Sequence, residues 1–370
     1  MKNIIISSSE TIYTLMKKRM NIKQFLPLCY AVLSITIALT FTQCTSDPEI
    51  VVPDVSNIEA SPQLFRLDSI FALSDLEKAL NEVEKFQEKH PEFSKLYFNQ
   101  VLRINVTPEN PQREQLKGFF SSEQGKKVIS KVSDKYADLD FLRKELSEAL
   151  KYYQHYFPDQ DLPNFYTFLS EYTLQVFLFE DENKTGVGIG LDLFLAPEMD
   201  YKNLDPRNPA FSNYLTRTYK KEYITKKVME ALIGDLLTPE RGSSLLEQII
   251  QEGKKSYILK KILPYAPDSI VFEQTQKQME WLENNELEMW SFFLEEDLLY
   301  ETSVRETMKY TKPRPDSPGM PEEAPGRTGN YLGHKIVTDY MKKNPTLKLQ
   351  DLLKTIDAQE MLDSYRPRRK

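Results

Sequence analysis

The sequence predicts an α+β domain that is predominantly α-helical and carries a small antiparallel sheet. Apolar residues recur at helical spacing in long segments before residue 157 and after residue 222. Between them, Tyr172–Glu180 and Gly186–Ala196 have the composition of strands. The chain shows no internal repeat, so one sheet covered by several helices is the simplest arrangement that buries both kinds of segment.

The N-terminal part of the domain is predicted to hold two long helices. Ser74 and Glu77 have the spacing of a capping box, and His90-Pro91 predicts the end of the helix that follows them. A second helical pattern covers residues 123–156 and stops before Pro158. Together these segments predict a helical half.

The middle of the chain is predicted to form a β-hairpin, with residues 181–185 as its loop. On the second strand, Gly188, Gly190 and Asp192 share one face. Glycines in a strand favour close approach by another backbone or the wall of a cleft, although they also occur without a binding role.

The C-terminal half is predicted to be helical again. Residues 311–328 contain five prolines and predict a loop. After the loop, Gly329 and Gly333 lie one helical turn apart and predict a close approach to a neighbouring helix. The helices expected around the loop cover residues 223–236, 243–263, 272–300, 329–343 and 347–353.

The N-terminus has the order of a bacterial lipoprotein signal. Basic residues at 17–23 precede 17 uncharged residues, Phe25–Phe41, and Cys44 follows closely. An uncleaved spanning helix needs about 20 apolar residues, whereas this run is shorter and contains Pro27. We therefore expect residues 1–43 to be removed and Cys44 to carry lipid such as palmitate. A start at Met16 or Met20 gives a more ordinary signal than Met1.

The rest of the chain is expected to hold a tether over residues 44–62, one globular domain over 63–363 and a basic tail over 364–370. Removing residues 1–43 leaves 43 basic and 54 acidic residues of the original 48 and 55. Such an acidic chain makes nucleic acid an unlikely partner, because phosphate binding needs a basic face. Cys29 lies inside the signal, so the mature domain is expected to have no disulfide, Fe–S cluster or cysteine nucleophile.

Sequence motifs for common catalytic sites are absent. The histidines His90, His155 and His334 do not form an HExxH zinc motif, and the chain has neither a GxSxG elbow nor a phosphate-binding GxxxxGK[ST] loop. We expect His334 to be structural rather than catalytic, and we expect no metal, cofactor or catalytic residue. The loop before Gly329 is either a rigid cover over the core or a recognition surface built from Glu322, Glu323 and Arg327.

Several segments resemble the GldB gliding-motility lipoproteins of Bacteroidetes. They are Phe293–Tyr300, Ser317–Arg327, the Gly329-x-x-x-Gly333 helix and the strand Gly188–Leu195. The resemblance covers residues 60–360 and includes the lipid signal, although His334 stands where an aromatic residue is expected. It implies a role in the cell envelope, in gliding motility and its associated type IX secretion apparatus, with envelope proteins as partners.

The order of elements is also distantly similar to that of zincin-type peptidases. The segment that corresponds to their HExxH helix is Met229–Ile233, where Glu230 remains but both ligand positions are apolar. This likeness predicts a zincin-like pseudoenzyme that binds a peptide by strand addition along Gly186–Ala196. The candidate partner-binding cleft consists of Asp192, Glu230, Glu322, Glu323 and Arg327.

Three functions therefore remain open. The favoured one is a lipid-anchored, periplasm-facing envelope protein that binds components of a motility or secretion machine and catalyses no reaction. The second is an envelope hydrolase that uses Asp192, Glu230 or their neighbours as acid and base. The third is a structural lipoprotein that only stabilises an assembly.

Overall fold

The computed structural model describes residues 52–104, 106–107, 110–239, 242–354 and 357–368. The predicted lipoprotein signal and Cys44 lie outside these residues. Within the described ranges, no helix combines the length and the apolar character needed to span a membrane. The predicted α+β class, predominantly α-helical with a small sheet, is confirmed.

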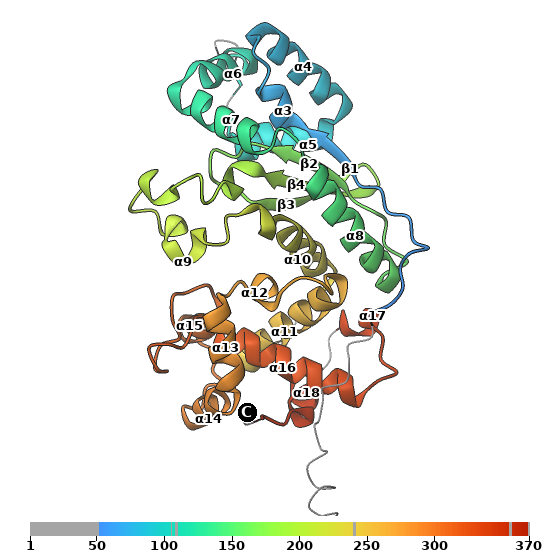
Figure 1. Cartoon of the computed structure of the whole chain (residues 1–370), viewed down its shortest axis with the longest axis vertical. Helices are drawn as coiled ribbons and strands as arrows, with labels where there is room; N and C mark the ends of the chain where they lie inside the picture. The colour runs from blue at the N-terminus through green and yellow to red at the C-terminus, as the bar shows by residue number, and fades with distance from the viewer. Residues whose placement is uncertain (1–51, 105, 108–109, 240–241, 355–356, 369–370) are drawn as a thin grey trace, which may run out of the picture. The chain divides into compact units, whose positions relative to one another are not determined.

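A four-stranded sheet in the order β1-β2-β4-β3 lies in the N-terminal half (Figure 1). Its strands are β1 (Gln63–Arg66), β2 (Asn164–Phe168), β3 (Val176–Asp181) and β4 (Lys184–Gly190).

The prediction of an antiparallel sheet is correct for the β3–β4 hairpin and wrong for the other pairs. β1 pairs with β2 in parallel, β2 pairs with β4 in parallel, and only β3 and β4 are antiparallel. The reason is the connection: a long helical crossover joins β1 to β2 and returns the chain in the same direction. The sheet is therefore mixed.

The second predicted strand is shorter than expected. β4 ends at Gly190, whose N–H donates to the Gln175 carbonyl at 2.8 Å, and residues Leu191–Phe194 form the short 3-10 helix η2. In this turn Asp192 points inward and accepts backbone N–H groups from the segment after β2. Since β4 has neighbours on both sides, the predicted strand addition along Gly186–Ala196 is wrong.

The glycines of β4 make room for aromatic rings. A Cβ atom on Gly186 would lie 2.2 Å from Phe179 Cζ, and one on Gly188 would lie 2.3 Å from Phe177 Cε1. The close approach predicted from Gly188 and Gly190 is thus made by a side chain of β3 at Gly188. At Gly190 it is made by another backbone, because a Cβ atom there would lie 2.1 Å from the Leu174 carbonyl oxygen.

Helices cover both faces of the sheet. Phe93 of α5 stacks on Tyr166 of β2 with ring centroids 4.6 Å apart, while α10 contacts β3 and β4 from the other side (Figure 1). The helices of the N-terminal half are α3 (Leu67–Phe71), α4 (Leu76–Lys89), α5 (Pro91–Leu96), the π-helical turn η1 (Tyr97–Val101), α6 (Gln112–Ser121), α7 (Glu123–Lys135) and α8 (Asp140–Tyr156).

Two predicted helix boundaries in this half are wrong. α4 is capped by Asp75, which accepts the Lys78 N–H, and not by a capping box at Ser74. The predicted helix over residues 123–156 is two helices, because Arg66 of β1 binds the backbone carbonyls of Tyr136 and Ala137 between them at 2.6 and 3.1 Å.

Short turns lead from the sheet into the C-terminal half. They are η3 (Tyr201–Asn203), η4 (Pro209–Phe211), α9 (Asn213–Thr216) and η5 (Lys221–Tyr223), and the helices that follow are α10 (Ile224–Leu236), α11 (Leu245–Ile262), α12 (Asp268–Val271), α13 (Gln276–Asn284), α14 (Glu286–Glu295), α15 (Val304–Thr311), α16 (Thr328–Lys343), α17 (Leu349–Leu352) and α18 (Ala358–Ser364).

The helix predicted over residues 272–300 is wrong in extent. Glu273 has a left-handed backbone, with φ 53°, and Thr275 caps α13. α13 ends where the Asn285 side chain donates to the Trp281 carbonyl at 2.7 Å. The predicted proline-rich loop is confirmed between α15 and α16.

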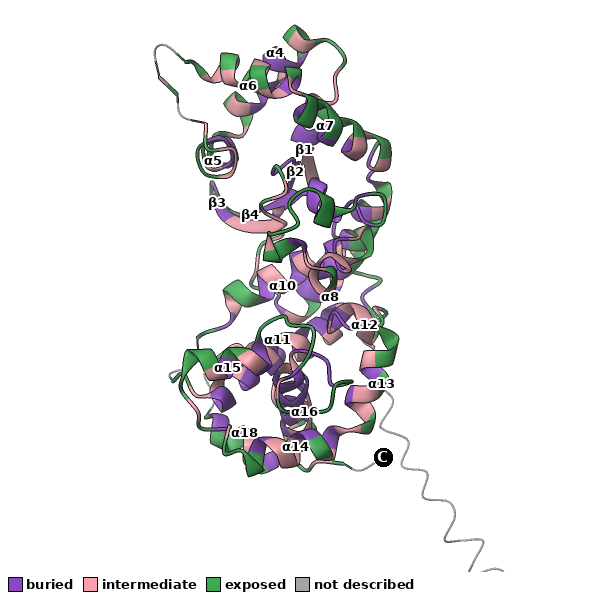
Figure 2. Ribbon diagram, turned by 90° about the vertical axis from the view of Figure 1, so that its left-hand side faces the viewer, coloured by how far each residue is buried: buried purple, intermediate pink, exposed green. Residues whose placement is uncertain are grey.

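Helices α11 and α16 form the tightest helix pair of the C-terminal half, and buried residues line both (Figure 2). A Cβ atom on Gly333 would lie 1.8 Å from the Ile249 carbonyl oxygen, and one on Gly253 would lie 2.3 Å from the Gly333 oxygen. The close helix approach predicted from Gly329 and Gly333 is confirmed.

Both ends of the described chain pack on the domain beyond its predicted limits of 63 and 363. Ala60 is buried, and its carbonyl accepts the Ser147 hydroxyl of α8 at 2.5 Å. At the other end, Tyr365 is buried and donates its hydroxyl to Glu286 at 3.0 Å. Parts of the expected tether and of the expected tail thus belong to the folded unit.

Candidate functional site

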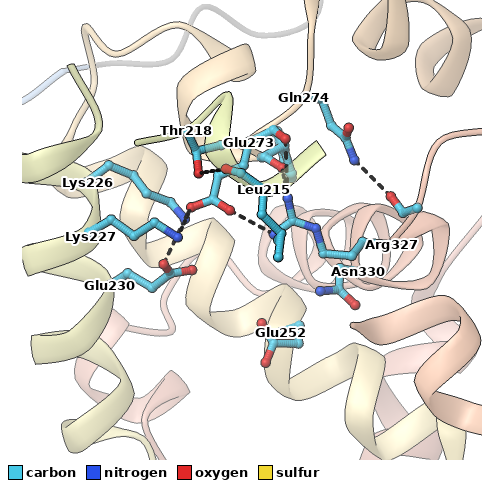
Figure 3. Close-up of polar contacts among 12 residues, drawn as sticks. Leu215, Thr218, Lys226, Lys227, Glu230, Glu252, Glu273, Gln274, Arg327 and Asn330 are labelled. Atoms are coloured by element: carbon cyan, nitrogen blue, oxygen red, sulfur yellow. Dashed lines mark hydrogen bonds and ion pairs between the residues drawn. The ribbon is translucent and has the colours of Figure 1, made fainter. Parts of the chain in front are cut away.

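Five charged residues meet where α10 faces the segment before α13 and the start of α16 (Figure 3), and Arg217, which follows α9, joins them. We call them the Glu273 cluster: Arg217, Lys226, Lys227, Glu230, Glu273 and Arg327. Two of its members, Glu230 and Arg327, belong to the cleft that the sequence predicts.

Glu273 is the hub of this cluster. Its carboxylate lies 2.8 Å from Lys226 Nζ, 2.5 Å from Lys227 Nζ and 3.1 Å from Arg327 Nη1. Its backbone carbonyl accepts Arg217 Nη2 at 2.7 Å. A left-handed backbone is costly for a residue that is not glycine, and these contacts hold Glu273 in that conformation.

Arg327 joins the proline-rich loop to the hub. It also has a left-handed backbone, with φ 65°, directly before α16, and its guanidinium donates to the Phe272 carbonyl at 3.1 Å. Next to it, Gln274 Nε2 donates to the Gly326 carbonyl at 2.8 Å. The end of the loop is thereby fixed to the segment before α13.

The charges of the cluster stabilise one another in a buried setting. Burial alone would raise the pKa of Glu273, but the charges of Lys226, Lys227 and Arg327 outweigh it and hold that pKa well below its ordinary value. Burial opposes the charge of Lys226 as well, yet Glu230 and Glu273 raise its pKa. The pKa shifts of Glu273 and Lys226 therefore both favour the charged forms.

The cavity beside the cluster is small. It has a volume of about 40 Å³ and is lined by Lys226, Glu230, Arg327, Glu252 and Ser256 among others. That is room for about one or two water molecules, whereas ligand pockets hold roughly 300–1,000 Å³. In this conformation the cluster cannot enclose a substrate.

The structure does not bring the five predicted cleft residues together. Glu230 and Arg327 meet at the hub, where Glu230 lies 2.8 Å from Lys226 Nζ. Glu322 and Glu323 are exposed on the proline-rich loop, although the loop itself is held by the Ser317 hydroxyl, which donates to the Pro325 carbonyl at 2.7 Å.

Asp192 lies in a separate place, behind the end of β2. It is fully buried and accepts the backbone N–H of Ser170 at 2.9 Å, that of Tyr172 at 2.6 Å, and the Ser170 hydroxyl. Burial raises its pKa to about 6 despite these hydrogen bonds. Asp192 lies away from the predicted cleft because β4 ends at Gly190, so the alternation of side chains along the strand does not extend to residue 192.

His334 stands in a structural setting. His334 packs against Phe272 and lies 3.1 Å from the Ser256 hydroxyl, and burial holds the pKa of His334 well below its ordinary value. Across the described residues, no group of three or more His, Cys, Asp or Glu side chains is arranged to hold a metal ion.

Sequence reasoning missed the centre of the cluster. Lys226 and Glu230 have the i, i+4 spacing of a helical ion pair, so this pair carried a signal. Glu273 carried none, because it sits in a turn inside a segment with helical character and its partners come from other parts of the chain.

Comparison with known proteins gives one match. The family model described as gliding motility protein GldB matches residues 49–367. No curated protein and no solved structure matches the chain. The likeness to zincins therefore stays a prediction.

Proposed function

Because the chain belongs to the GldB family of gliding motility proteins, we propose that it is a lipid-anchored component of the cell envelope. In this proposal it binds other proteins of the gliding machinery and its associated secretion apparatus, and it catalyses no reaction. Lipid on Cys44 holds it at a membrane surface, with the domain facing the periplasm.

The observation that carries the non-catalytic part is the engagement of the predicted acid and base. Glu230 is bound to Lys226 at 2.8 Å, and Asp192 is fully buried under hydrogen bonds to backbone N–H groups. A general base must reach the proton that it removes from a substrate. Asp192 is out of reach, and the Glu230 carboxylate is already paired with Lys226, which favours binding over the hydrolase alternative.

The lipid anchor is tested by labelling cells with palmitate. We expect label in the protein and its loss in Cys44→Ala, while Cys29→Ala is the matched control, because Cys29 lies inside the segment that is removed. Label that persists in Cys44→Ala would refute the anchor.

The binding role is tested by cross-linking intact envelopes and isolating the protein by an affinity tag. We expect discrete partners at fixed stoichiometry, retained in Glu230→Gln. If no partner is isolated and a peptidase activity disappears in Glu230→Gln, the hydrolase is correct and the binding proposal fails.

A further inference from the structure

The outer edge of the sheet at β3 carries hydrogen-bonding groups that no strand uses. β3 is the last strand in the order β1-β2-β4-β3. In its pairing with β4, the Gln175–Gly190 hydrogen bond shows that odd-numbered residues face β4. The N–H and C=O groups of Val176, Leu178 and Glu180 therefore point outward, and no hydrogen bond within the described residues engages them.

A large hollow adjoins the hairpin end of this strand and extends past β4 to the loop before β2. The hollow has a volume of about 620 Å³ and is lined by Leu178, Glu180 and the turn of the hairpin. Val176 and Leu178 are half-buried, and Glu180 is exposed. An extended segment could therefore reach the backbone of β3 and place alternate side chains against these three residues.

The charge of the hollow selects the segment. Asp159, Asp161, Glu180 and Asp235 line it, and Lys184 is the one cation among its lining residues within the described chain. None of the four carboxylates forms an ion pair with another described residue. The hollow is therefore an anionic surface that opposes acidic segments and attracts basic ones.

A second copy of the chain is a poor occupant. Pairing β3 with β3 would bring the same carboxylates of two molecules together, and like charges at a strand pair are unfavourable. The edge thus fits a different protein better than it fits itself.

We infer that β3 docks an extended, basic segment of a partner protein by strand addition, with apolar residues facing Val176 and Leu178 and lysine or arginine facing the carboxylates. The inference rests on the proposed binding function and names the surface and the partner chemistry. It replaces β4, which has no free edge, as the place where a strand is added.

The test uses the full chain in detergent and two fluorescently labelled heptapeptides with capped ends. Both contain Thr-Val-Thr-Val-Thr. One has two lysines before this segment and the other has two lysines after it. Fluorescence anisotropy should show saturable binding of at least one of them. Methylating the alternate peptide amides that face β3 should weaken its binding at least tenfold, since each lost hydrogen bond costs about 1 kcal/mol and leaves an acceptor unpaired. Methylating the other amides should change binding less than threefold.

Variants of the protein test the same surface. Leu178→Pro removes an outward N–H without removing a bond to β4, so we expect at least tenfold weaker binding, whereas Leu178→Ala keeps that N–H and should lose less. Asp159→Asn combined with Asp161→Asn should weaken binding severalfold at low salt, and glutamates in place of the peptide lysines should abolish it.

Three results would overturn the inference: no binding by either peptide, equal effects of the two methylation patterns, or equal binding of the acidic peptide. If Leu178→Pro fails to fold by circular dichroism, the methylated peptides still decide. The peptides probe the edge of β3 alone. If they fail to bind while envelope cross-linking isolates partners, this inference is wrong and the proposed binding function stands. If cross-linking isolates no partner, the proposed binding function fails whatever the peptides show.

Discussion

Replacing Gly333 with alanine should force α11 and α16 apart. The added Cβ would lie 1.8 Å from the Ile249 carbonyl oxygen, where an ordinary contact needs about 3.3 Å. The obstacle is backbone and cannot rotate away, so we expect the upper end of overpacking costs, about 3 kcal/mol. Alanine returns about 1 kcal/mol of helix propensity, which leaves a net loss near 2 kcal/mol.

Gly234 in α10 is the matched control. A Cβ there would meet nothing nearer than Lys255 Cε at 4.0 Å, so Gly234→Ala should stabilise the domain by about 1 kcal/mol. Urea unfolding followed by the fluorescence of Trp281 and Trp290 reports on the C-terminal half that contains the helix pair. We expect the two variants to differ by about 3 kcal/mol, with wild type between them.

The reasoning is refuted if Gly333→Ala unfolds at the same urea concentration as wild type or at a higher one. Such a result would mean that the helices can move apart at no cost and that the glycines are not what sets their distance.

Three further predictions test the site and the sheet. Glu273→Gln should lower the free energy of unfolding by about 3–5 kcal/mol, because it leaves buried cations uncompensated. Glu230→Gln should lower it by less than about 1 kcal/mol, because Glu230 is partly exposed and Lys226 keeps its contact with Glu273. Urea unfolding of the two variants compares these losses. Burial raises the pKa of Asp192 to about 6, so the folded state disfavours the charged form of this carboxyl group. The contribution of Asp192 to the free energy of unfolding should therefore fall by about 2 kcal/mol as the pH rises from 4 to 7. The stability difference between wild type and Asp192→Asn measured across this range should show that fall, and a constant difference would contradict it. Gly188→Ala should lose about 1–3 kcal/mol against the Phe177 ring. In a double-mutant cycle followed by thermal unfolding, the same change should cost much less when Phe177 is already alanine.

The elements that the sequence predicts well are long and locally periodic. α10, α11 and α16 lie where their apolar spacing and flanking signals place them, and the two glycines of α16 predict its close packing. The β3–β4 hairpin is found for the same reason, because its pairing is local.

The missed strands are short and depend on distant partners. β1 has four residues, and β2, Asn164–Phe168, is buried along most of its length, so it shows no alternation of polar and apolar side chains. The parallel pairing that defines both strands brings Gln63 beside Asn164. No local pattern contains that information.

The candidate site was predicted in part. Glu230 and Arg327 do meet, but the residue that joins them, Glu273, has no pattern of its own. Asp192 was assigned to the same face by strand alternation, which fails because the strand ends at Gly190. Side-chain alternation locates a residue only as far as the ladder of hydrogen bonds continues.

The pairing of β1 with β2 also bears on the order in which the domain assembles. Closing the loop from Gln63 to Asn164 costs about 4 kcal/mol of chain entropy, more than the short loop from Asn164 to Gly186 that joins β2 to β4. We therefore expect β1 to add last to a sheet already formed by the other three strands. It should also open first, as faster amide hydrogen exchange in β1 than in β2 would show. The least protected strand of the sheet is then the one closest in sequence to Cys44, so any load carried by the predicted lipid anchor reaches β1 before the other three strands.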